Sequence, residues 1–276
     1  MKTKHPLILR ILPPLALLAI TSSLTASEDD LKAKAVLAQY RDCVVTVQAV
    51  AELHMSAESE GKQKAAPDKD VPVGGVATIV RSEGILVSAF SFFDPSSAFD
   101  GKTINGPGGK KAKLDVSVGA IKQVKFVLGD GTEVPGEVLL KDAVLDIIVL
   151  RADADAWKKA GAEKLPAVDL DKSGEAELLD TVVVIGLSGP GFGREVMASG
   201  SGIIVKATKP RLVYRPTFAQ KGGPAFLLNG RLLGIGAQHV YRDKLVNDSV
   251  FVPAADVADV VRQALASRAP AAQAKP

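Results

Sequence analysis

The sequence is poor in the side chains that form covalent cross-links and bind metal ions. Its 276 residues include one cysteine, Cys43, and three histidines, His5, His54 and His239. A single cysteine excludes a disulfide bond within the chain, and the apolar run CVVTVQAV that begins at Cys43 is typical of a buried thiol. No His, Cys and carboxylate residues cluster at the spacing of metal ligands. We therefore expect no metal site.

The sequence also lacks a long uninterrupted apolar run. Its most apolar N-terminal stretch, residues 11–20, is short and contains Pro13 and Pro14, so we do not expect it to span a membrane. Basic residues precede this stretch, and small residues lead from it to Ala26, as in a secretory signal. The sequence predicts a signal peptide over residues 1–26 and an exported protein, periplasmic or secreted. A retained N-terminal anchor is the alternative.

Neither sign of charge is in excess once this segment is set aside. Residues 1–26 contain three basic residues and no acidic one, which leaves 31 basic and 31 acidic residues in the rest of the chain. A protein that binds nucleic acid needs a basic surface to neutralise phosphates. We therefore expect no nucleic-acid partner.

Short apolar segments separated by turn residues make up most of the chain. Asn229-Gly230 lies between two such segments and predicts a hairpin in which both turn residues have positive φ. This pattern favours a β-barrel or sandwich over alternating strands and helices. The polar segments 54–72 and 94–113 are predicted to be exposed loops. We expect strands at 43–50, 74–80, 85–89, 123–128, 133–140, 146–151, 181–185, 202–208, 212–215, 225–228, 232–237 and 249–252.

Three stretches in this order point to a known family: GDGTEVPGEVLLKDAVLDIIVLR, VVVIG with the glycine loop after it, and KGGPAFLLNGRLLGIG. They resemble the trypsin-like serine proteases, especially the HtrA/Deg branch, over about residues 35–253. The resemblance implies an all-β fold of two six-stranded β-barrels with short N- and C-terminal helices. We expect the first helix and barrel in residues 27–165, the second barrel in 166–253, and a helix with a flexible tail in 254–276. No stretch of the printed chain is left for the PDZ module that HtrA-type proteins usually carry.

The resemblance also marks three positions that hold the catalytic serine, histidine and aspartate in the family. Asp146, in VLDIIVLR, falls at the aspartate's place. The family pattern G-x-I-L-T-N-x-H, matched on Ile85 and Leu86, puts Phe90 at the histidine's place, and a phenylalanine cannot accept a proton. The family motif G-N-S-G-G-P reads AQKGGP, with Lys221 at the serine's place. No catalytic triad is therefore expected.

Two further sets of residues are implied by the same resemblance. The turn that forms the oxyanion hole corresponds to Ala219, Gln220, Lys221 and Gly222, with Ala219 in the place of the motif's first glycine. The strand that follows the hairpin borders the substrate cleft in the family. Its main-chain groups could pair with an extended peptide. The peptide-binding residues expected there are Gly236, Ala237, Gln238 and His239.

A glycine-rich loop at 186–193, GLSGPGFG, invites comparison with a phosphate-binding loop. It lacks the Gly-Lys-Ser/Thr ending of a P-loop, and no clear helix follows it. HtrA-type proteins have a loop of the form I-G-N-P-F-G at this point, so the loop is interpreted as structural and no cofactor is expected.

Three functional hypotheses follow. The first is an exported, inactive protease homologue that binds peptides or a partner protein, in which Lys221 pairs with Asp146 or with a ligand carboxylate. The second is a hydrolase with a rewired site, built either from Ser88 and Lys221 or around His239. The third is a structural module that docks through the 94–113 segment or the terminal helix. HtrA-type relatives are commonly trimers, so a homo-oligomer is possible.

Overall fold

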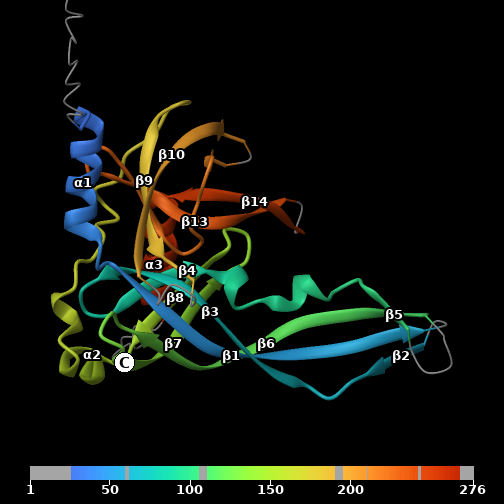
Figure 1. Ribbon diagram of the computed structural model, residues 1–276. Helices are drawn as coiled ribbons and strands as arrows, with labels where there is room; N and C mark the ends of the chain where they lie inside the picture. The colour runs from blue at the N-terminus through green and yellow to red at the C-terminus, as the bar shows by residue number, and fades with distance from the viewer. Residues whose placement is uncertain are drawn as a thin grey trace, which may run out of the picture.

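The computed structural model describes residues 26–59, 62–105, 111–189, 195–209, 211–241 and 244–267. Strands dominate it, and short helices lie at either end of the described chain (Figure 1). The predicted signal peptide, apart from Ala26, and the predicted tail at 268–276 lie outside the described residues. In the described part of the chain, no helix is long and apolar enough to cross a membrane.

The first barrel is a sheet closed by the pairing of its first and last long strands. Alternating side chains of these strands fill its interior, among them Val47, Ile79, Leu86, Phe126 and Ile148, all fully buried. The short strands β2 (Lys62–Ala65) and β5 (Thr103–Asn105) extend the sheet at its two edges. Around the barrel, the strands follow the order β1 (Val44–Ser59), β3 (Lys69–Arg81), β4 (Ile85–Ala89), β8 (Ile147–Ala152), β7 (Glu133–Asp142) and β6 (Lys111–Val127), which pairs with β1.

The second barrel is also closed. Its interior includes Val182, Val184, Ile203, Tyr214 and Phe251. The two six-stranded barrels confirm the predicted fold class. Around this barrel, the strands follow the order β10 (Val196–Ala207), β11 (Val213–Pro216), β14 (Lys244–Pro253), β13 (Leu232–Tyr241), β12 (Pro224–Leu227) and β9 (Thr181–Leu187), which pairs with β10.

The helices match the predicted ones. Ser27 caps α1 (Glu28–Tyr40) by accepting a hydrogen bond from the Asp30 N–H at 3.1 Å. Helix α2 (Ala154–Lys159) and the 3-10 turn η4 (Ala162–Lys164) follow β8, between the strands of the two barrels. Helix α3 (Ala254–Ala266) follows β14 directly and buries one face in an apolar cluster to which both barrels contribute. Its buried face therefore helps to hold the two barrels together.

Two predicted loops are partly wrong. Segment 54–72 is mostly strand, because β1 continues to Ser59, β2 follows, and β3 begins at Lys69. Segment 94–113 contains the 3-10 turn η2 (Pro95–Ala98), β5 and the start of β6. Together these strands form a β-ribbon that projects far from the first barrel (Figure 1).

The Asn229-Gly230 hairpin is confirmed, although its turn differs from the predicted one. Gly230 has φ +81°, whereas Asn229 is not among the residues with positive φ. The Asn229 side chain instead accepts a hydrogen bond from the Arg231 N–H at 3.0 Å. A turn with one left-handed glycine followed by an irregular pairing is the next most common hairpin connection, and the pairing of β12 with β13 does shift after Ala225.

The two barrels meet closely at Gly222. The Thr78 hydroxyl on β3 of the first barrel donates to the carbonyl of Gly222, which belongs to the second barrel, at 2.7 Å. Gly222 has φ +73°, and a Cβ there would lie 2.0 Å from the Val76 carbonyl oxygen. Only glycine fits this position without moving one barrel away from the other.

We predict that Thr78→Val destabilises the protein. Valine keeps the shape of threonine but leaves the buried Gly222 carbonyl without its donor, which costs about 1–3 kcal/mol. Urea unfolding should show this loss, while Thr103→Val on the exposed strand β5 serves as the matched control. Equal unfolding free energies for the two variants would contradict the prediction.

Candidate functional site

Asp146 lies at the point where the first barrel meets β13 of the second. It immediately precedes β8, its relative exposure is 1%, and its φ is +55°, which is uncommon for a residue other than glycine. Its Oδ1 accepts the Ser91 N–H at 2.5 Å, and its Oδ2 accepts the Ser91 hydroxyl at 3.0 Å and the Gln238 N–H at 2.7 Å. Three donors from two barrels therefore converge on one buried carboxylate.

The environment of Asp146 acts on its pKa in both directions. Burial is the largest effect and raises the pKa above its ordinary value. The hydrogen bonds from Gln238 and Ser91 and the positive charge of Lys221 act in the opposite direction without reversing the shift. Burial therefore makes the Asp146 carboxyl group costly to ionise. Hydrogen bonds, rather than an ion pair, offset part of that cost.

A single 3-10 turn, η1 (Phe90–Phe92), arranges the groups around Asp146. The Phe90 N–H donates to the Asp146 carbonyl at 3.0 Å, and this bond sets the start of the turn. The Phe90 ring lies 5.9 Å from the Lys141 ammonium rather than on the carboxylate. The side chain beside the Asp146 carboxylate is therefore Ser91, one residue beyond the predicted position.

A sequence signal for Ser91 was present. The family pattern begins with glycine, and counting its eight places from Gly84 leads to Ser91. Matching the pattern on Ile85 and Leu86 instead leads to Phe90. Neither Phe90 nor Ser91 carries an imidazole. Both alignments therefore predict that a histidine general base is missing from this position.

Lys221 lies on the other side of η1. It forms an isolated β-bridge with Gly236, and its Nζ lies 4.8 Å from the centre of the Phe92 ring. The ring in turn packs on Gly75, where a Cβ would come within 2.2 Å of it. Lys221 forms no ion pair with Asp146 among the described residues, although its charge is near enough to affect the Asp146 pKa.

The turn at 219–223 is held by main-chain hydrogen bonds. The Gly222 N–H donates to the Gly236 carbonyl at 2.7 Å, and the Gly236 N–H donates to the Gly223 carbonyl at 2.8 Å. The Gly223 N–H donates to the Gln220 carbonyl at 3.0 Å. Both main-chain groups of Gly236 are thus used within the protein, which leaves none for a peptide at this residue.

The other predicted peptide-binding residues also lie on β13. Ala237 is buried opposite Val250 of β14, and the Gln238 N–H is the donor to Asp146. His239 is half-buried at an irregularity in the pairing of β13 with β14, and it is not a hydrogen-bond partner of Asp146. The strand therefore borders the Asp146 site, as expected, but two of its N–H groups serve the protein itself.

Ser88 lies near the turn that contains Lys221, because a Cβ at Gly222 would come within 3.1 Å of the Ser88 Oγ, but no hydrogen bond joins Ser88 to Lys221 among the described residues. Ser88 is fully buried, and its hydroxyl donates to the Val76 carbonyl at 2.6 Å, so it cannot meet a substrate.

His54 lies on the ribbon, where its Nδ1 is 2.8 Å from Asp68 Oδ1. The hydrogen bond and charge of Asp68 raise the pKa of His54.

The predicted glycine loop is described only in part. Gly186 and Leu187 belong to β9, and residues 190–194 lie outside the described residues. A Cβ at Gly186 would come within 2.5 Å of the Gln220 side chain, so this glycine allows the oxyanion turn to pack on β9. Among the described residues, no group of three His, Cys, Asp or Glu side chains could hold a metal ion.

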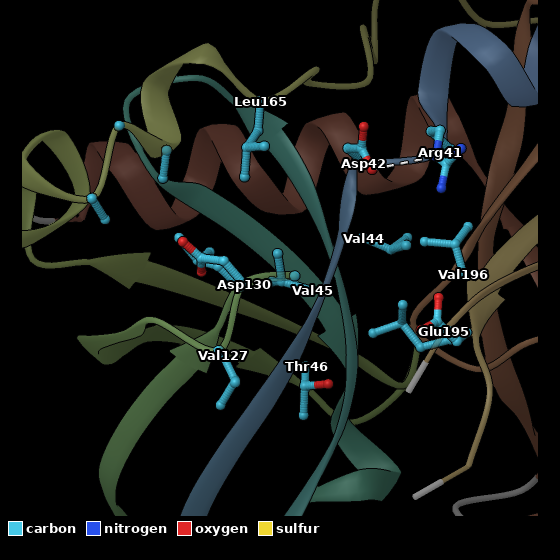
Figure 2. A pocket seen from close by; sticks show the side chains of 17 residues that line it. Arg41, Asp42, Val44, Val45, Thr46, Val127, Asp130, Leu165, Glu195 and Val196 are labelled. Atoms are coloured by element: carbon cyan, nitrogen blue, oxygen red, sulfur yellow. Dashed lines mark ion pairs between the residues drawn. The ribbon is translucent and has the colours of Figure 1, made fainter. Parts of the chain in front are cut away.

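A cavity of about 570 Å³ lies away from this site (Figure 2). Apolar side chains such as Val44, Val45 and Leu165 form part of its wall, and the pair Arg41–Asp42, with 3.6 Å between Nε and Oδ1, lies at its edge. Its described lining joins the start of β1, the β6–β7 turn and the β9–β10 hairpin, and includes neither Asp146 nor Lys221.

The fold agrees with the comparison to known families. The family model described as "Trypsin-like peptidase domain" matches residues 75–235, which is more than half of the chain. The chain therefore belongs to the trypsin-like peptidase domain family.

Individual relatives point to the HtrA branch. A "Probable periplasmic serine endoprotease DegP-like" of Halomonas elongata is 33% identical over 154 residues, which is 51% of this chain and 30% of that protein. The chain thus spans less than a third of this relative's length. The solved structure "HtrA-type protease AlgW with decapeptide" matches 85% of this chain and 67% of its own, with TM-score 0.53 and 14% identity. A serine endoprotease from Yersinia pestis matches 85% of this chain and 66% of its own, with TM-score 0.52 and 13% identity.

We predict that Asp146 makes the stability depend on pH. Its pKa in the folded protein lies above that in the unfolded chain, so its contribution is fully present below the unfolded pKa and is lost as the pH rises through the folded one. Relative to Asp146→Asn, the wild type should gain unfolding free energy as the pH falls from about 7 to about 4. Urea unfolding at several pH values measures this difference. A difference that is constant, or that shrinks at low pH, would show that the pKa is not raised.

Proposed function

We propose that this protein is an exported trypsin-like domain that does not hydrolyse peptide bonds and instead binds a peptide or a partner protein. The observation that carries the proposal is the set of partners around Asp146. In a working triad this carboxylate orients an imidazole, whereas its donors in this protein are Ser91 and Gln238. Among the described residues, the only side chain that hydrogen-bonds to the Asp146 carboxylate is that of Ser91.

The serine position supports the same proposal. Lys221 could act as a nucleophile only with an adjacent base or in a setting that depresses its pKa. Its Nζ instead lies 4.8 Å from the centre of the Phe92 ring, and no hydrogen bond joins it to a base among the described residues. Ser88, the other nucleophile considered, is buried and already bonded to the Val76 carbonyl.

The contacts that hold the two barrels together support binding without hydrolysis. Gly222 and Thr78 still join the barrels, and β13 still borders the Asp146 site, so the surface next to the former catalytic groups remains ordered. One structural relative bears a title that includes a decapeptide. For export, support comes from the relative named periplasmic and from the signal-like residues 1–26.

The first test is degradation of casein by the purified chain beside Asp146→Ala. We expect no turnover by either protein, because neither has a general base at the site. Turnover by the wild type that is lost in Asp146→Ala would contradict the proposal and reveal a working site around Asp146. Turnover that survives the substitution would contradict it too, once a repeat purification shows that the activity belongs to this chain.

A second test rebuilds the triad. Ala219→Gly and Lys221→Ser are combined with either Ser91→His or Phe90→His, and each protein is treated with a fluorophosphonate probe that labels activated serines. We expect labelling only with Ser91→His, because a side chain at 91 already reaches the Asp146 carboxylate. Labelling of the Phe90→His version, or of neither, would contradict the assignment of Ser91 to the histidine's place.

A further inference from the structure

The Lys221 ammonium has an aromatic partner and no anionic one. Its Nζ lies over the Phe92 ring, and no ion pair or hydrogen bond joins it to a carboxylate among the described residues. The ring is itself held in place by Gly75, so it fixes the position of the charge. A half-buried ammonium of this kind keeps its hydrogen-bond donors available for a bound anion.

The turn that contains Lys221 also has main-chain donors. The N–H groups of Gly222 and Gly223 are bonded within the turn. Those of Ala219, Gln220 and Lys221 donate to no acceptor among the described residues. Because the protein supplies no acceptor to these three N–H groups in the described part of the chain, they are available to a bound anion.

Asp146 does not fill this role. Its two oxygens already accept three hydrogen bonds, and its separation from Lys221 is too large for an ion pair. Its negative charge also limits what can bind. One ammonium and neutral N–H donors match an anion of one charge, whereas a second charge on the ligand would be opposed by the nearby carboxylate.

We propose that Lys221 and the free N–H groups of residues 219–221 bind the carboxylate of a peptide ligand. The carboxylate is either the C-terminal group or an Asp or Glu side chain, since both present the same two oxygens. The proposal rests on the proposed function, because a peptide that is not cleaved can stay bound. In this proposal, Lys221 supplies a fixed positive charge at the position where the family has its nucleophilic serine.

The test uses a short fluorescein-labelled peptide of alanine and valine in three forms. One has a free C-terminal carboxylate, one a C-terminal amide, and one a C-terminal amide with a single internal aspartate. Anisotropy titrations measure their dissociation constants for the wild type, Lys221→Met, Lys221→Arg and Lys102→Met. Lys102 is the matched control because its ammonium also lies over a phenylalanine ring, 6.0 Å from the centre of Phe99.

We expect the wild type to bind a carboxylate form at least about tenfold more tightly than the plain amide. Lys221→Met should abolish this preference, Lys221→Arg should retain most of it, and Lys102→Met should leave it unchanged. Which carboxylate form binds identifies the source of the anion. No preference in the wild type, no binding of any form, or a preference that survives Lys221→Met would overturn the proposal.

A second measurement does not depend on the folding of a variant. Acetate added to the ¹⁵N-labelled wild type should shift the amide signals of residues 219–221, while acetamide should not. Equal shifts with both, or none with acetate, would overturn the site. The casein test is independent of these outcomes: turnover would refute the proposed function, whereas a missing carboxylate preference in an inactive protein would refute only the carboxylate site.

Discussion

The buried carboxylate of Asp146 is the interaction on which the arrangement of this protein depends. It draws an N–H and a hydroxyl from η1 in the first barrel and an N–H from β13 in the second, and it adopts a left-handed backbone conformation to do so. A conformation of this kind costs about 1–3 kcal/mol and persists only where its surroundings impose it. Asp146 thus serves as a structural link between the two barrels.

Under the proposed function, this link explains how the fold would persist without catalytic groups. The histidine and the serine of a protease act mainly on the substrate, so having Ser91 and Lys221 at their places, as we propose, would leave the barrels joined. The aspartate and the glycine of the turn also hold the protein together: Gly222 sits where a Cβ would strike the Val76 carbonyl. The two kinds of position are therefore under different constraints.

Much of the fold could be predicted from the sequence because it depends on local patterns. The Asn229-Gly230 turn, the Ser27 cap and the alternating strands each carry a local signal, and each is present in the structure. The ribbon is not predicted because segments 54–72 and 94–113 are rich in polar and charged residues, which are typical of exposed loops. Ala112, Leu114 and Val116 alternate with charged and polar neighbours, which is the pattern of a strand with one covered face.

The site was predictable only at the level of residue types. The predictions for Asp146 and Lys221 rest on dense motifs, whereas the histidine pattern is sparse, and a shift of one residue separates Phe90 from Ser91. The partners of a carboxylate depend on distant segments: Gln238 is 92 positions from Asp146. No local pattern reports such a contact, nor the cation over the Phe92 ring.

Burial of Cys43 lowers the reactivity of the one thiol in the sequence. Its side chain is fully buried, and burial raises the pKa of its thiol far above the ordinary value. The thiolate is the form that exchanges with disulfides and reacts with oxidants. A protein released into an oxidising compartment with such a thiol is protected from cross-linking to other chains. Its lone cysteine is chemically silent for as long as the first barrel stays folded.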